Sequence, residues 1–94
     1  MLGFAMRAGK VVIGTEQIIR SLQKGNVKLV LISGAASDAT KKKLASKSEY
    51  YNAFSIEVDI DTERLGKMLG KSYAPAAVAV TDERFAEEIK KASV

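Results

Sequence analysis

The 94-residue sequence predicts an α/β fold, a three-layer α/β/α sandwich around a four-stranded mixed sheet. The first observation behind this prediction is that short, β-branched-rich apolar runs alternate with longer amphipathic stretches along the chain. The second is that glycines and helix-capping residues stand between these segments. The third is that 47% of the residues are hydrophobic, which is enough for a packed core at this length. We therefore expect a single domain spanning residues 1–94.

Four apolar runs are expected to form the strands. Residues 28–32 read Lys-Leu-Val-Leu-Ile, a continuous apolar run that is typical of a strand buried on both faces. Residues 54–58 alternate apolar and polar side chains with a period of two, which predicts a strand with one buried face. The two other predicted strands are residues 11–13, cut off by Gly14, and residues 76–80.

Five stretches are expected to form helices: residues 2–8, 15–24, about 37–51, 61–69, and a last helix that begins at Thr81 or Asp82. Ser37 and Asp61 are well placed as N-caps, because their side-chain oxygens can accept from exposed backbone N–H groups. Glycines follow the first, second and fourth of these stretches, as is usual at helix ends. The side chains expected to face the core are Ile18, Ile19, Leu22, Leu44, Ser48, Tyr51, Leu65, Met68, Leu69, Phe85 and Ile89.

The composition excludes several classes of site. The sequence contains neither cysteine nor histidine, so a disulfide scaffold, a thiolate metal site and the commonest general base are all absent. We expect no metal and no cofactor. No stretch approaches the roughly 18 apolar residues of a membrane-spanning helix. The first residues lack the apolar core and cleavage site of a signal peptide, and a cytoplasmic protein is therefore expected.

Residues 66–72, Gly-Lys-Met-Leu-Gly-Lys-Ser, suggest a phosphate-binding loop at first sight. That motif needs four residues between its glycines, whereas three separate Gly66 from Gly70, and it should open a helix rather than follow one. We interpret Gly70 as a helix end and Gly66 as a site of close helix–sheet approach. The acidic residues mostly precede or open predicted helices, where the helix dipole favours them. With no assembled nucleophile and base, the sequence predicts a protein that is not an enzyme.

Charge is distributed unevenly along the chain, although the net charge is only +4. Residues 1–47 hold nine Lys or Arg and two acidic residues, for a net charge of +7. Residues 48–94 hold six Lys or Arg and nine acidic residues, for a net charge of −3. A basic half attracts polyanions, but an ordinary solvated surface would also explain this pattern.

Residues 10–25 carry the strongest functional signal. Gly14 permits a tight turn after a strand, and Thr15, Glu16 and Gln17 then begin a helix whose exposed N–H groups suit phosphate oxygens. Arg20 lies on the same face one turn later, and that face continues to Lys24. The residues alone leave two interpretations open: a polyanion-binding surface or an ordinary amphipathic surface helix.

A resemblance to a known family bears on this choice. The family motifs in this chain are Arg7-Ala8-Gly9-Lys10, Gly14-Thr15-Glu16-Gln17-Ile18-Ile19-Arg20, Lys24-Gly25, Lys28-Leu29-Val30-Leu31-Ile32, Ala36-Ser37-x-x-Thr40-Lys41-Lys42-Lys43, Leu65-Gly66-Lys67, Gly70 and Ala76-Ala77-Val78-Ala79-Val80. In this order and spacing they resemble the ribosomal kink-turn RNA-binding family of the L-seven-Ae and L-thirty-e type, and above all its bacterial YlxQ-like branch. The resemblance covers residues 2–89.

The resemblance implies an RNA site on adjacent loops. By position, the residues that would recognise tandem sheared G·A pairs are Gly14, Thr15, Glu16, Gln17 and Arg20, with Lys10 and Lys24 as flanking cations. The loop that would cover a flipped-out nucleotide is Lys71, Ser72 and Tyr73, where the tyrosine ring could stack on a base. One departure is Glu16, because archaeal and eukaryotic members carry asparagine there and a carboxylate cannot donate the amide hydrogen bonds.

The expected partner is therefore a structured, kinked RNA, including ribosomal RNA. The protein is expected to be a monomer associated with the ribosome, and it is expected to bind neither a membrane nor a small-molecule substrate. The alternative is a protein–protein adaptor of the same fold that docks the basic helix of residues 41–47 on an acidic partner. A third possibility, the substrate-binding fragment of an RNA methyltransferase, is disfavoured because the chain has no catalytic segment.

Overall fold

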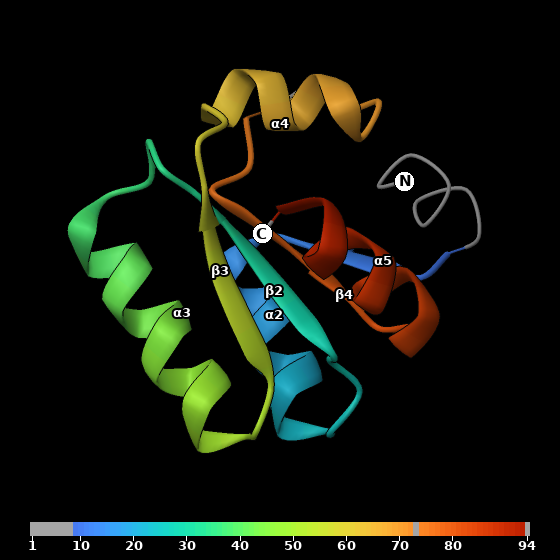
Figure 1. Cartoon of the computed structure of the whole chain (residues 1–94). Helices are drawn as coiled ribbons and strands as arrows, with labels where there is room; N and C mark the ends of the chain where they lie inside the picture. The colour runs from blue at the N-terminus through green and yellow to red at the C-terminus, as the bar shows by residue number, and fades with distance from the viewer. Residues whose placement is uncertain (1–8, 73, 94) are drawn as a thin grey trace.

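The structure is a computed structural model that describes residues 9–72 and 74–93. Its elements follow one another as β1 (Val11–Ile13), α2 (Thr15–Gln23), β2 (Leu29–Ser33), α3 (Asp38–Tyr50), β3 (Phe54–Val58), α4 (Thr62–Met68), β4 (Ala77–Val80) and α5 (Glu83–Ser93) (Figure 1). The helix expected at residues 2–8 lies outside the described residues, as does Tyr73. Each of the four predicted strands is confirmed.

The four strands form one mixed sheet in the order β1-β4-β2-β3. The strand β4 pairs antiparallel with both β1 and β2, whereas β3 runs parallel to β2 at the opposite edge. This arrangement confirms the mixed four-stranded sheet predicted from the sequence.

Helices cover both faces of the sheet, which confirms the three-layer architecture. The side chains of β4 alternate: Val78 and Val80 belong to the core cluster that includes residues of α4 and α5, while Ala77 and Ala79 belong to the cluster that includes residues of α2 and α3. Figure 1 shows α5 in front of the sheet and α2 behind it. Because alanines face α2 and α3, this second pair of helices meets small side chains on the central strand.

The helix starts confirm most of the capping residues read from the sequence. Ser37 accepts from the Thr40 N–H at 3.2 Å at the start of α3, and Asp61 accepts from the Arg64 N–H at 2.7 Å at the start of α4. Asp82 rather than Thr81 caps α5, since its carboxylate accepts from the Phe85 N–H at 3.1 Å. The side chains of these residues therefore satisfy one N–H group at the start of each of three helices.

Gly70 acts as the end of α4, as the sequence predicted, and not as part of a phosphate loop. Its φ is +70°, a backbone conformation suited to glycine. The Gly70 N–H donates to the Lys67 carbonyl at 3.0 Å, and the Lys71 N–H donates to the Gly66 carbonyl at 2.9 Å. These two hydrogen bonds use the last carbonyl groups of the helix and direct the chain into the loop before β4.

Two apolar side chains on predicted core faces are exposed instead: Met68, and Phe54 from the alternating apolar face of residues 54–58. Phe54 is 49% exposed because it begins the edge strand β3, where the Lys90 ammonium lies 4.5 Å from its ring centroid. Met68 is 44% exposed at the end of the short α4, where Leu65 within the helix and the C-cap residue Leu69 are buried instead. Both errors arise at the ends of elements, where periodicity no longer decides which side chains are buried.

The Ser37 cap offers a test of local stability. Replacing Ser37 with alanine removes the hydroxyl that accepts from the Thr40 N–H and donates to the Thr40 hydroxyl at 2.9 Å. We expect Ser37→Ala to lower the free energy of unfolding by about 1 kcal/mol in urea denaturation. The matched control is Ser46→Ala, because Ser46 is exposed inside the same helix and should change stability by less than about 0.5 kcal/mol. Equal losses in the two variants would show that the cap contributes nothing.

Candidate nucleic-acid interface

Several loops named in the sequence analysis meet at one end of the sheet. Ile13, the last residue of β1, pairs with Val78 near the start of β4, and Ile32 near the end of β2 pairs with Ala77. The turn at Gly14 therefore lies at the same end as the loop that leads from α4 into β4. The structure thus places the start of α2 and the loop with Lys71 and Ser72 at the same end of the sheet, as the predicted site requires.

The start of α2 differs from the other helix starts. Its N-cap is Gly14, with φ +99° and ψ 140°, and no side chain of the described residues caps it. The first helical hydrogen bond runs from the Ile18 N–H to the Gly14 carbonyl at 2.9 Å. The N–H groups of Thr15, Glu16 and Gln17 come before this bond and remain available to an external acceptor such as a phosphate oxygen.

The two faces of α2 have separate roles. Ile18 and Leu22 are buried against the sheet. Glu16, Gln17 and Arg20 are exposed on the other side of the helix, next to the N–H groups at its start. Packing therefore fixes the helix through its apolar face and leaves the predicted site residues accessible.

A groove of about 360 Å³ runs between α2 and α3 and has a net positive charge. It is lined by Glu16, Ile19, Arg20, Gln23, Lys43 and Lys47, that is, by three cations and one carboxylate. The ion pairs found in the described part of the chain lie elsewhere, between Lys41 and Glu57 at 3.6 Å and between Lys90 and Glu87 at 3.4 Å. The groove cations are therefore available to neutralise a bound polyanion.

A second hollow of about 420 Å³ lies where α4 meets the following loop. Its walls are Glu63, Lys67, Lys71, Ser72 and Ala74, so it includes two of the three predicted loop residues. The third, Tyr73, falls outside the described residues. This hollow stands at the same end of the sheet as the Gly14 turn, because Ala74 leads directly into the start of β4.

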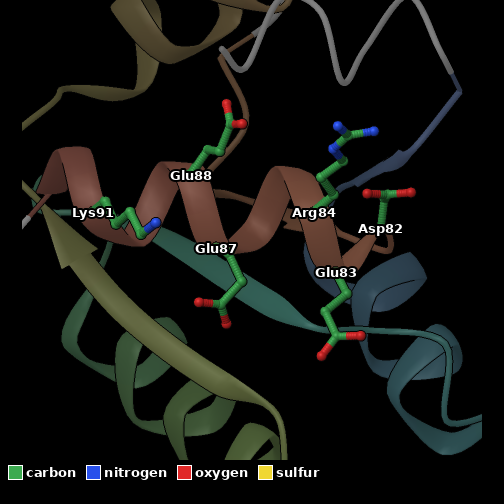
Figure 2. A pocket seen from close by; sticks show the side chains of 6 residues that line it. All are labelled: Asp82, Glu83, Arg84, Glu87, Glu88 and Lys91. Atoms are coloured by element: carbon green, nitrogen blue, oxygen red, sulfur yellow. The ribbon is translucent and has the colours of Figure 1, made fainter.

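A third hollow, of about 570 Å³, lies on α5 and has the opposite charge balance. Figure 2 shows its side chains projecting from the one helix and the residue before it: Asp82, Glu83, Arg84, Glu87, Glu88 and Lys91. Four carboxylates against two cations make this surface unsuitable for a polyanion. The α2–α3 groove is the better candidate.

Two of the predicted cations do not lie at the Gly14 turn. Lys10 precedes β1 while Gly14 follows it, which separates their backbones by about 13 Å at the usual rise of a strand. Lys24 stands at the far end of α2, about 14 Å along the helix from Thr15. Gln23 lines the α2–α3 groove in place of Lys24.

Lys43 and Lys47 are absent from the site predicted from the sequence. Their helix belongs to the alternative protein-docking hypothesis, whereas the structure places both lysines in one groove with Arg20. Their four-residue spacing showed that they share a helix face, but only the strand order could show that this face meets α2. The predicted RNA site and the predicted docking helix are therefore neighbouring surfaces.

In the described parts of the chain, residues 9–72 and 74–93, no group of three or more acidic residues is arranged to hold a metal ion. None of the helices seen there has the length and apolar character needed to cross a membrane.

Comparison with known proteins places the chain in a family. The RNA-binding protein YlxQ of Bacillus subtilis is 39% identical over 89 residues, covering 95% of this chain and 87% of that protein. The large ribosomal subunit protein eL30 of Sulfurisphaera tokodaii is 28% identical over 89 residues, covering 92% of this chain and 84% of that protein.

A solved structure supports the same placement. A protein with unknown function from Bacillus halodurans superposes with a TM-score of 0.89 at 33% identity, covering 96% of this chain and 89% of that one. The sequence profile of one family also matches residues 1–90. The resemblance inferred from the motifs is thereby confirmed, and the chain belongs to the ribosomal protein L7Ae/L30e/S12e/Gadd45 family.

Proposed function

We propose that this chain is a non-catalytic RNA-binding protein that recognises kinked RNA containing sheared G·A pairs. In this proposal it acts as a monomeric, single-domain protein in the cytoplasm, on ribosomal RNA or a related structured RNA. The names of two relatives support the proposal, since YlxQ is an RNA-binding protein and eL30 is a ribosomal protein. The proposal assigns the recognition of the RNA to the Gly14 turn and the start of α2.

The observation that carries the proposal is the uncapped start of α2. In α3, α4 and α5 the side chains of Ser37, Asp61 and Asp82 accept hydrogen bonds from the first turn. At α2 a glycine takes that place and no side chain of the described residues caps the helix, and the groove that begins beside Glu16 carries three cations. A phosphate or base acceptor would supply the missing cap.

The side chains beside this turn fit the recognition of distorted RNA. The exposed Gln17 amide both donates and accepts, so it can pair with base edges that a kink makes accessible. Arg20, one turn later, offers a planar fork that binds a phosphate or a guanine edge through two hydrogen bonds. A regular RNA duplex would not present base edges and phosphates together to these side chains, because the base edges in its deep groove are inaccessible to protein side chains.

The loop after α4 would hold a second part of the same RNA. Lys71 and Ser72 line the hollow at the same end of the sheet and present a cation and a hydroxyl. In the proposed complex these groups contact the nucleotide that the kink turns outward. The two contact areas together would favour a bent strand over a straight one.

The proposal is tested by salt-titrated binding of the full chain to two RNAs of equal length. One contains a kink-turn, and in the other the sheared G·A pairs are replaced by Watson–Crick pairs. We expect at least about a tenfold preference for the kink-turn at every salt concentration, because the affinities for the two RNAs have the same electrostatic dependence on salt. Equal affinity for both RNAs would contradict kink recognition, and no affinity for either would contradict RNA binding.

Replacing Glu16 with a neutral residue is expected to increase the affinity for kink-turn RNA. Its carboxylate is exposed at the start of α2, where it would repel a bound phosphate and cannot donate a hydrogen bond. We expect Glu16→Asn to tighten kink-turn binding by about two- to fivefold, the usual size of an exposed charge interaction. The matched control is Glu83→Asn, which makes the same charge change in α5 and should leave the dissociation constant unchanged. Weaker binding by Glu16→Asn would mean that Glu16 itself accepts from the RNA.

A further inference from the structure

Three side chains of α3 form a row on one face of the helix: Lys43, Lys47 and Tyr50. Spacings of four and three residues place them one above another. We propose that this α3 row, together with the α2–α3 groove, binds the RNA strand as it leaves the Gly14 turn. Lys43 and Lys47 contact phosphates, and the Tyr50 ring stacks on a base. The inference rests on the proposed function and adds a second contact surface to it.

The groove leads directly away from the Gly14 turn. Because β4 is antiparallel to both β1 and β2, these two strands point the same way, and the helices that follow them run side by side in one direction. Figure 1 shows α2 and α3 finishing at the same end of the molecule. The groove therefore begins beside Glu16 and continues to Gln23, about 10 Å further along α2. On α3 its last lining residue is Lys47, and Tyr50 follows one turn later on the same helix face.

The two groove lysines differ from their neighbour Lys41. Lys41 belongs to the same basic run in the sequence, but its ammonium pairs with Glu57 of β3 at 3.6 Å. Lys43 and Lys47 face Arg20 across the groove instead, and neither forms an ion pair with the residues that the structure describes. Three cations around a single carboxylate form the kind of groove that tracks a phosphodiester backbone.

Tyr50 is unusually exposed for an aromatic residue. Its side chain is 76% accessible, more than any other large hydrophobic residue in the described chain. The ring meets that of Tyr51 edge to face, with centroids 4.8 Å apart, and Tyr51 packs on the core cluster beneath α2 and α3. Tyr50 is thus held in place from behind yet open to solvent, beside two lysines. A base can stack on such a ring without any rearrangement of the protein.

An acidic protein partner is the competing occupant of this row. RNA is favoured because the groove shares Glu16 and Arg20 with the proposed RNA site, so that one strand can contact both surfaces. An exposed aromatic ring at the end of a row of cations also matches single-strand binding surfaces more closely than a salt-bridged protein contact.

The test compares Lys43→Gln/Lys47→Gln with a control of equal charge change, Lys42→Gln/Lys91→Gln, on the kink-turn RNA. Lys42 and Lys91 are exposed and do not line the α2–α3 groove. The measured quantity is the slope of log affinity against log salt. If both groove lysines contact phosphates, the slope falls by about 1.4 to 1.8, and the control changes it by less than about 0.5. Equal slopes in the two double variants overturn the proposal and favour the acidic-partner alternative.

Substitutions of Tyr50 provide a second, independent test of this proposal. We expect Tyr50→Ala to weaken kink-turn binding at least about fivefold, whereas Tyr50→Phe, which keeps the ring, leaves it unchanged. Unchanged affinity of Tyr50→Ala for the RNA would show that Tyr50 does not stack on a base. The preference of the wild-type chain for kinked over regular RNA is measured in parallel. If the wild-type chain shows no such preference, the proposed function is contradicted. If the preference is present but the slope of log affinity against log salt is the same in the groove-lysine variant as in the wild-type chain, only the role of the α3 row is contradicted.

Discussion

Arg20→Ala is expected to weaken the binding of kink-turn RNA by about ten- to hundredfold at constant salt. Arg20 lies one turn after the uncapped start of α2 and also lines the α2–α3 groove, so it belongs to both proposed contact surfaces. The guanidinium can make two hydrogen bonds to one phosphate or guanine, which a single ammonium cannot reproduce. Fluorescence anisotropy with labelled RNA measures the change directly.

The control for Arg20→Ala is a lysine outside both contact surfaces. Lys42→Ala suits this purpose because Lys42 is exposed on α3 and does not line the groove, and it should weaken binding by no more than about threefold. Lys90 is unsuitable, because its ammonium pairs with Glu87 at 3.4 Å and lies over the Phe54 ring. Equal losses in the arginine and lysine variants would mean that Arg20 contributes only its charge.

Gly14→Ala is expected to reduce both stability and RNA affinity. The φ of +99° and ψ of 140° at Gly14 lie outside the regions open to other residues, and forcing an alanine there costs about 1–3 kcal/mol. No heavy atom lies within 4 Å of the added Cβ, so this cost comes from the backbone rather than from a clash. Relief of the strain would turn the N–H groups of Thr15 to Gln17 away from the RNA. We therefore expect at least a tenfold loss of affinity, together with a lower urea midpoint.

Gly25→Ala separates these two effects. Gly25 also has a positive φ, of +75°, with no atom near an added Cβ, but it stands at the far end of α2. This variant should lose about 1 kcal/mol of stability and keep the RNA affinity of the wild-type chain. A similar loss of affinity in both glycine variants would show that Gly14 acts through stability alone.

The order of elements and most of their boundaries could be predicted from local patterns. The run of apolar residues in β2 and the alternation in β3 each correspond to one strand. Ser37 and Asp61 begin helices where the sequence placed them, because capping is a local interaction between a side chain and the next turn. Gly70 ends α4 for a similarly local reason.

Features that depend on the strand order could not be predicted in this way. The sequence does not show that β4 lies between β1 and β2, and this placement puts the Gly14 turn and the loop containing Ser72 at the same end of the sheet. The same placement sets α3 beside α2 and adds Lys43 and Lys47 to the groove. The sequence also did not show that an intervening strand, β1, separates Lys10 from Gly14.

The central claim is that RNA binds at the start of α2, and amide chemical shifts during titration with kink-turn RNA test it most directly. We expect the largest shifts at the N–H groups of Thr15, Glu16 and Gln17, with further shifts at Lys71 and Ser72 and almost none along α5. Large shifts on α5, with the N–H groups at the start of α2 unmoved, would contradict this location of the site.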